Sequence, residues 1–206
     1  MSVPFLEVDN LRKEYSRGLI NKQVTFSLEA NFSIEEPAIV GMMGPNGSGK
    51  TTLFELITGS NLPSSGRVMV MGQNIHNVRY DERDRLAIHY HQSYQVRSFH
   101  RTRPKFMMQP ANCEYPMVHL FDEPQFNTQD GYIGFMLDFF RKLRGEGRLV
   151  FVCLHPNEPF HLNIMREVCE RYIFVRDGSL TLADDFDTLI ELEPVRDYLG
   201  RLVDAA

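Results

Sequence analysis

The chain has 206 residues, of which 43% are hydrophobic and 24% are charged, a composition that excludes an intrinsically disordered protein. The formal net charge of −5 argues against broad coating of nucleic acid, and three cysteines without a CxxC spacing argue against a disulfide framework. The acidic residues near the start argue against a signal peptide, and the lack of a long apolar run argues against a membrane span. We therefore expect a cytoplasmic protein with a single domain over residues 1–206.

The first third of the chain has the patterns of β-strands around a glycine-rich loop. Residues 5–8 and 24–28 alternate apolar and polar side chains, as half-buried strands do. Residues 38–43 are nearly all apolar, which is typical of a strand buried on both faces. After the loop, residues 51–58 have helical character and residues 68–71 favour another strand.

The remainder alternates between apolar runs and helical patterns. The expected strands are residues 117–121, 149–154 and 172–175. The expected helices are residues 132–143, closed by Gly145 and Gly147, and residues 186–201. Strands that alternate with helices predict an α/β fold with a largely parallel sheet flanked by helices, joined to an N-terminal antiparallel β portion.

The strongest motif is the octapeptide of residues 44–51, GPNGSGKT, which matches G-x-x-x-x-G-K-[ST] between a buried strand and a helix. Its glycines let backbone N–H groups turn toward phosphate oxygens, and the helix N-terminus adds its dipole. Lys50 is placed to reach the terminal phosphates, and the Thr51 hydroxyl can bind Mg²⁺. The motif predicts a P-loop NTPase whose nucleotide phosphates are bound together with Mg²⁺.

Two adjacent carboxylates follow the apolar run at 117–121. Asp122 can bind Mg²⁺ directly or through water, and Glu123 can polarise the attacking water as a general base. An Asp-Glu-Pro sequence after a strand is also compatible with a plain turn. His155 ends another expected strand and could donate a hydrogen bond to the γ-phosphate, although a lone histidine is more often structural.

Beyond these motifs, the sequence resembles the ATP-binding cassette (ABC) family over most of its length. The resemblance is carried by five segments in the family's order: LEVDNL with the following Tyr15, IVG followed by GPNGSGKTT, PMVHLFDEP at residues 116–124, VFVCLH at 150–155, and RYIFVRDG at 171–178.

The resemblance implies a role for each matching residue. Tyr15 corresponds to the aromatic platform for adenine, and Gln92 corresponds to a glutamine that touches Mg²⁺, although Gln95 competes for that part. His155 corresponds to the switch histidine, beside Glu123 as the catalytic base and Asp122 and Thr51 as metal residues. The nucleotide is expected to be held by Tyr15, Asn46, Gly47, Ser48, Gly49, Lys50, Thr51 and Thr52.

One part of the family pattern is missing from the sequence. The family carries a helical lobe with a Leu-Ser-Gly-Gly-Gln signature, but only 23 residues lie strictly between Gln92 and Pro116. Residues 98–102, at the signature's place, contain no glycine. We therefore expect the helical subdomain to be largely missing, with residues 93–116 as its shortened replacement.

The replacement is basic, and three interpretations of Arg97, Arg101 and Arg103 stay open. They are a solvated loop, an arginine finger that reaches a γ-phosphate in trans, and a patch that binds a polyanion. Nearby, His89 and His91 lie at i and i+2, on one face of a strand, but no third metal ligand is evident in the sequence.

The resemblance implies an Mg·ATP-binding and hydrolysing ABC-type ATPase subunit that energises a membrane transport system. It would act as a homodimer or heterodimer, attached through a membrane permease to the inner face of the membrane. The alternative is a nucleotide-binding switch or regulatory subunit with little hydrolysis. A third hypothesis, a cassette acting on ribosomes or nucleic acid, is disfavoured by the sequence, which has neither a second cassette nor an inserted coiled coil.

Overall fold

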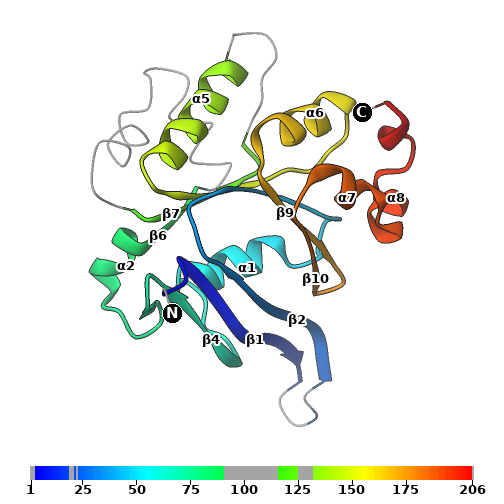
Figure 1. The fold of residues 1–206 in the computed structure, drawn as a ribbon. Helices are drawn as coiled ribbons and strands as arrows, with labels where there is room; N and C mark the ends of the chain where they lie inside the picture. Colours follow the sequence, from blue (N-terminus) through cyan, green and yellow to red (C-terminus); the bar gives the residue numbers. More distant parts are fainter. Residues whose placement is uncertain (1–2, 19–20, 22, 91–115, 125–131, 206) are drawn as a thin grey trace.

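The computed structural model describes residues 3–18, 21, 23–90, 116–124 and 132–205. In this part of the chain the strands form two sheets (Figure 1). The first sheet has the strand order β2-β1-β4-β5, and all of its pairings are antiparallel. Its strands are β1 (Leu6–Arg17), β2 (Gln23–Ile34), β4 (Ser65–Val70) and β5 (Gln73–Asn74).

The second sheet has the strand order β10-β9-β3-β8-β7-β6. Its pairings are parallel from β9 to β6, and β10 pairs antiparallel with β9 at one edge. Its strands are β3 (Ile39–Met43), β6 (Ala87–Tyr90), β7 (Val118–Asp122), β8 (Leu149–Cys153), β9 (Arg171–Arg176) and β10 (Ser179–Ala183). Strands β3, β7 and β8 are buried along their whole length, which agrees with a parallel sheet covered on both faces.

Helices cover the second sheet on both sides (Figure 1). Helix α1 (Lys50–Ile57) follows the glycine-rich loop and packs into the core between the two sheets. Helix α2 (Tyr80–Leu86) leads into β6. The opposite face of the sheet carries α5 (Tyr132–Gly145), α6 (Pro159–Val168), α7 (Phe186–Glu191) and α8 (Glu193–Leu199), followed by the 3₁₀ helix η1 (Gly200–Ala205).

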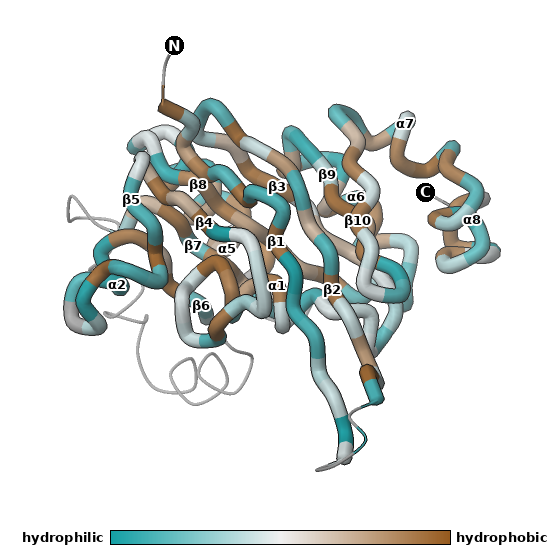
Figure 2. The backbone as a smooth tube through the Cα atoms, turned by 90° about the horizontal axis from the view of Figure 1, so that it is seen from below, coloured by the Kyte–Doolittle hydropathy of each residue, from teal (hydrophilic) through white to brown (hydrophobic). Residues whose placement is uncertain are grey.

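Two hydrophobic cores follow from this layering. The first joins the antiparallel sheet to α1 and one face of the parallel sheet, through side chains such as Leu6, Phe54 and Phe151. The second joins the other face to α5–α8, through Phe121, Phe140 and Leu162 among others. Central strand β8 is hydrophobic along its length (Figure 2). The parallel strands of the second sheet end at the edge where α1 begins, and the candidate site lies at this edge.

The predicted α/β fold with an N-terminal antiparallel β portion is confirmed. The expected helix over residues 186–201 is wrong in detail. It is broken at Leu192, whose backbone is extended, and restarts with Pro194 in the first turn of α8, where proline is favoured. Helices α2 and α6 and strand β10 were not predicted from the sequence.

The expected single domain stays a prediction, and the shortened lobe over 93–116 lies almost wholly outside the described residues. In the ranges that the structure does describe, no helix is both long and apolar enough to span a membrane.

Candidate nucleotide-binding site

The shape of the phosphate loop depends on glycines, because its backbone takes conformations that residues with a side chain rarely adopt. Gly44 has φ 152°, and an added Cβ there would overlap the carbonyl oxygen of Val175. Gly49, with φ 111°, ends the loop directly before α1. Ser48 fixes the loop to a neighbouring turn, because its carbonyl accepts from the N–H of Gly178 at 3.1 Å. The loop is therefore preorganised between β3 and α1.

Lys50 lies inside this loop and is only 7% exposed. Its Nζ donates to the carbonyl oxygens of Gly44 and Pro45, both at 2.8 Å. The ammonium group is thus held by the backbone of the loop itself. In the same loop the buried Oγ of Ser48 has no hydrogen-bond partner within the described part of the chain. Both groups fit a phosphate ligand.

A cavity of about 240 Å³ opens over the loop. It brings residues of the phosphate loop together with Glu123, from the acidic motif, and Phe26, from β2. Its lining residues are Phe26, Asn46, Gly47, Gly49, Lys50, Thr51, Thr52 and Glu123. Sequence reasoning missed Phe26, although the alternation of β2 could have pointed to an aromatic side chain on the face toward the loop.

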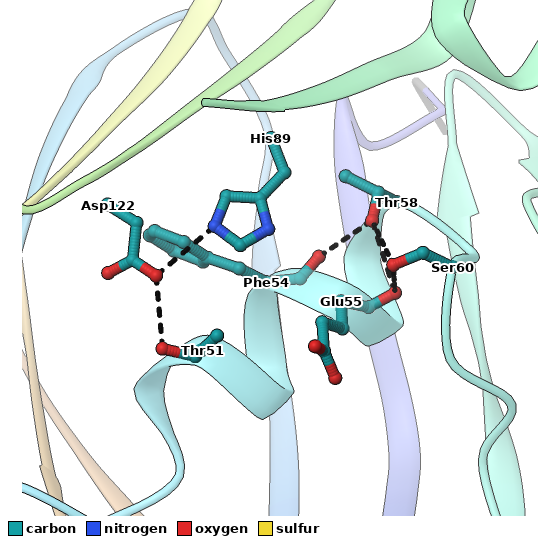
Figure 3. Close-up of polar contacts among 7 residues, drawn as sticks. All are labelled: Thr51, Phe54, Glu55, Thr58, Ser60, His89 and Asp122. Carbon is teal, nitrogen blue, oxygen red and sulfur yellow. Dashed lines mark hydrogen bonds and ion pairs between the residues drawn. The ribbon is translucent and has the colours of Figure 1, made fainter. Parts of the chain in front are cut away.

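Asp122 connects the acidic motif to the loop (Figure 3). The Thr51 hydroxyl donates to Oδ2 of Asp122 at 3.0 Å, and Nε2 of His89 lies 3.2 Å from the same oxygen. Burial raises the pKa of Asp122, but the hydrogen bonds and charge of His89, with the hydrogen bonds of Thr51 and Cys153, outweigh it and leave the pKa below its usual value. An ionised carboxylate beside a hydroxyl is a set of hard oxygen donors, which fits Mg²⁺.

Glu123 has an unusual backbone conformation for a residue with a side chain, with φ 49°. Its N–H donates to the carbonyl of Cys153 at 3.0 Å, which helps to hold it there. Glu123 lines the cavity over the phosphate loop. A strained residue that presents a carboxylate to a pocket is a common feature of functional sites.

His155 follows β8 and is joined to the C-terminal part of the chain. Its Nδ1 lies 2.9 Å from the hydroxyl of Tyr198, on α8. Burial raises the pKa of Tyr198 to about 12, and the negative charge of Glu123 acts in the same direction. Tyr198 therefore keeps its proton at neutral pH and is available as a donor to the imidazole.

Tyr15 does not line the cavity directly. It is 38% exposed, and its hydroxyl accepts from the side chain of Asn61 at 2.8 Å. Its ring lies 6.2 Å from that of Phe26, its partner across β1 and β2. The predicted adenine platform is thus separated from the loop by Phe26. Gln92, the other predicted contact to Mg²⁺, lies outside the described residues, as do Gln95, Arg97, Arg101 and Arg103.

Comparison with known proteins agrees with this geometry. The family model described as ABC transporter matches residues 28–123. The chain is 44% identical over 71 residues to the ATP-binding protein ChvD of Rhizobium radiobacter, a match that covers 34% of the chain and 22% of that protein. It is 42% identical over 77 residues to the energy-dependent translational throttle protein EttA of Escherichia coli K12, covering 37% and 13%. With the ABC transporter ATP-binding protein YxdL of Bacillus subtilis it shares 39% over 74 residues, covering 36% and 28%.

Among solved structures, the chain resembles the dimeric, post-hydrolysis state of the ATP-binding cassette MJ0796 bound to ADP and Pi. The TM-score is 0.66 at 18% identity, and the match covers 87% of this chain and 98% of that one. At this identity the likeness shows the fold alone. The matches to curated relatives span less than a third of each relative's length.

Fold and loop together are those of the P-loop NTPase class. The predicted resemblance to the ATP-binding cassette family is confirmed, because the chain has the fold of solved ABC cassettes and residues 28–123 match the family model described as ABC transporter.

Proposed function

We propose that this chain binds Mg·ATP and hydrolyses it as an ABC-type ATPase. One observation carries the proposal: Lys50, Thr51 and Glu123 line a single cavity, and Asp122 is hydrogen-bonded to Thr51 beneath it. Lys50 would neutralise the terminal phosphates, Thr51 and Asp122 would hold Mg²⁺, and Glu123 would take the proton of the attacking water. The bound cation supplies charge neutralisation at the phosphates.

The other predicted site residues have supporting roles in this proposal. Asn46, Gly47, Ser48, Gly49 and Thr52 would cradle the phosphates, and His155 would contact the γ-phosphate. Tyr15 and Phe26 would together offer aromatic surface to the adenine. Gln92 is proposed as a further contact to Mg²⁺ from its place in the sequence.

Two variants test the proposal. Lys50→Ala should abolish nucleotide binding, measured by calorimetry, while circular dichroism shows the fold unchanged. Glu123→Gln should keep ATP binding and lose at least ~10²-fold in steady-state turnover, because the amide keeps the shape of the side chain but is not a base. Unchanged affinity in a folded Lys50→Ala protein would contradict the phosphate-loop assignment. Full turnover by Glu123→Gln would move the base to another residue, with His155 the first alternative.

The finer proposal is that hydrolysis energises membrane transport through a permease partner, with the chain as a homodimer or heterodimer at the inner face of the membrane. The likeness to YxdL, an ABC transporter ATP-binding protein, and to the dimeric MJ0796 cassette supports it. A permease partner predicts that the protein co-sediments with membranes of its own cells and that these membranes raise its ATPase rate.

A second candidate is favoured by the likeness to EttA, a translational throttle protein. In that case the chain would be a nucleotide-dependent switch rather than a transport subunit. Co-sedimentation with ribosomes instead of membranes, together with slow turnover, would favour the switch. The two candidates share the nucleotide site and differ in the partner that responds to it.

A further inference from the structure

His89 belongs to neither the phosphate loop nor the acidic motif, yet it lies against the carboxylate of Asp122 (Figure 3). Nε2 of His89 is 3.2 Å from Oδ2 of Asp122, and the histidine side chain is only 6% exposed. An ionised carboxylate is an acceptor only, so Nε2 carries the proton and donates it. The contact is therefore a directed hydrogen bond from a buried imidazole.

The two strands place these side chains together by their register. β6 and β7 are parallel neighbours, and His89 pairs with Leu120, two residues before Asp122. Because side chains alternate along a strand, Asp122 points to the same face as Leu120 and His89. That face packs against α1, which supplies Thr51.

Phe54 of α1 fixes the orientation of the imidazole. The two rings meet edge to face, with centroids 5.4 Å apart and an interplanar angle of 82°. Phe54 is fully buried and packs in turn on Phe151, at 5.9 Å. His89 can therefore keep its direction toward Asp122 without help from a ligand.

Thr51 and His89 donate to the same oxygen from different elements, α1 and β6, and Figure 3 shows them approaching it from different sides. Their roles separate once a cation is present. The oxygen of Thr51 would then be a ligand, so that its hydroxyl is shared between the metal and Asp122. His89 would still donate to Asp122 without being a ligand of the metal itself.

We propose that His89 is a positioning residue for the divalent cation: its hydrogen bond to Oδ2 holds the Asp122 carboxylate beside the Thr51 hydroxyl in the arrangement that Mg²⁺ requires. The inference rests on the proposed function, since it takes Asp122 and Thr51 as the groups that face nucleotide-bound Mg²⁺. Loss of such an outer partner typically lowers metal affinity 10- to 100-fold.

A matched pair of variants tests the donor. In His89→Gln the amide nitrogen stands as many bonds from Cβ as Nε2 does and can still reach Asp122, whereas in His89→Asn it is one bond short. A fluorescent ATP analogue is titrated into each protein in saturating Mg²⁺ and in EDTA, and the ratio of the two dissociation constants gives the coupling to the cation. His76→Asn is the control, because His76 is half-buried and its Nε2 contacts a backbone oxygen, that of Asn61.

We expect the coupling ratio to be the same in wild type, His89→Gln and His76→Asn. In His89→Asn the ratio should be about 10- to 100-fold smaller. Affinity in EDTA should be equal in all four proteins. Thermal melts establish that each is folded, and both substitutions at position 89 keep a polar side chain for this reason.

Four results would overturn the inference. Wild-type coupling in His89→Asn shows that Asp122 needs no donor at position 89, while the proposed function stands. Loss of coupling in His89→Gln as large as in His89→Asn shows that the ring and not its N–H matters. Binding by wild type that does not depend on Mg²⁺ removes the cation from the site. No binding by wild type at all defeats the proposed function, and the inference with it.

Discussion

Tyr198 shows how a residue far from every motif can act on the candidate site. It lies 43 positions after His155, but α8 brings its hydroxyl to 2.9 Å from Nδ1 of that histidine. With its pKa raised to about 12 by burial, the phenol stays protonated at neutral pH. A phenol that donates to Nδ1 leaves the imidazole proton on Nε2, the tautomer that can donate to a γ-phosphate.

We therefore predict that Tyr198→Phe weakens binding of a non-hydrolysable ATP analogue about 2- to 10-fold, the value of one hydrogen bond, and leaves ADP affinity unchanged. Calorimetry with both nucleotides measures the difference. Tyr172→Phe is the control, because its hydroxyl donates to the backbone oxygens of Met165 and Cys169 instead. Equal losses for the ATP analogue and ADP would mean that Tyr198 has only a structural role.

At the scale of residues, the motifs indicated the phosphate loop and the acidic pair, whereas the apolar patterns did not show which other side chains lie beside them. The loop from Gly44 to Thr51 is made of consecutive residues, so its spacing of glycines is enough to predict its conformation. Phe26 and His89 reach the site through strand register, and Tyr198 reaches it through the packing of a helix on the sheet. Spacing in a single sequence can assign a side chain to one face of its strand or helix, but it does not show which distant residue that face meets.

At the scale of elements, β6 and β7 are joined by a stack of parallel rings on the face away from α1. Tyr90 stacks on Phe121 at 4.5 Å, and the buried His119 lies parallel to both rings. The hydroxyl of Tyr90 is 3.0 Å from Nδ1 of His119. Burial, with a smaller contribution from the positive charge of Arg148, lowers the pKa of His119 to about 3.

This stack predicts a specific loss of stability in acid. Between pH 3 and about 6.5, unfolded His119 binds a proton that the folded form does not, so the free energy of unfolding falls as the pH drops through that window. His119→Phe should reduce the slope by up to ~1.4 kcal/mol per pH unit, while costing about 1–3 kcal/mol at neutral pH through the partner lost by Tyr90. Urea unfolding at several pH values measures both effects.

His76 and His161 also have pKa values lowered by burial, so the variant should keep a residual slope. Asp122 adds a loss of the same sign, but in a lower window, since its pKa is already below the usual carboxyl value. A slope between pH 4.5 and 6.5 that is the same in His119→Phe and wild type would contradict the assignment.

Elements themselves were predicted well where one pattern ran without interruption, as in the apolar strands β3, β7 and β8. Prediction failed at the C-terminal end, where the apolar spacing of residues 186–201 continues across the break at Leu192. The apolar pattern does not reveal that break, because Val195 and Leu199 are still buried in the core after a new helix starts near Pro194.

For the whole molecule, the two sheets leave the phosphate loop at an open surface of the chain. The cavity there is lined by residues of the loop together with Phe26 and Glu123. A cassette of this shape is expected to complete the site with a second copy, as in the proposed dimer. The family's glycine signature is missing from residues 98–102, so another group must meet the phosphate.

We predict that ATP drives dimerisation of the Glu123→Gln protein, which binds nucleotide but does not consume it. Replacing Arg97, Arg101 and Arg103 together by alanine should abolish this dimer, because a guanidinium reaching across can supply the positive charge that the signature helix would have supplied. Sedimentation velocity with Mg·ATP, with Mg·ADP and without nucleotide measures the effect.

The matched control removes the same charge elsewhere, at Arg141, Arg144 and Arg166 of α5 and α6, whose exposed ion pairs contribute little to stability. A dimer that survives the change at 97, 101 and 103 would exclude the arginines as the cap. A dimer weakened equally by both triple changes would point to net charge alone. A Glu123→Gln protein that binds ATP and stays monomeric would show that each copy works by itself, which would favour the nucleotide-dependent switch over the paired transport ATPase.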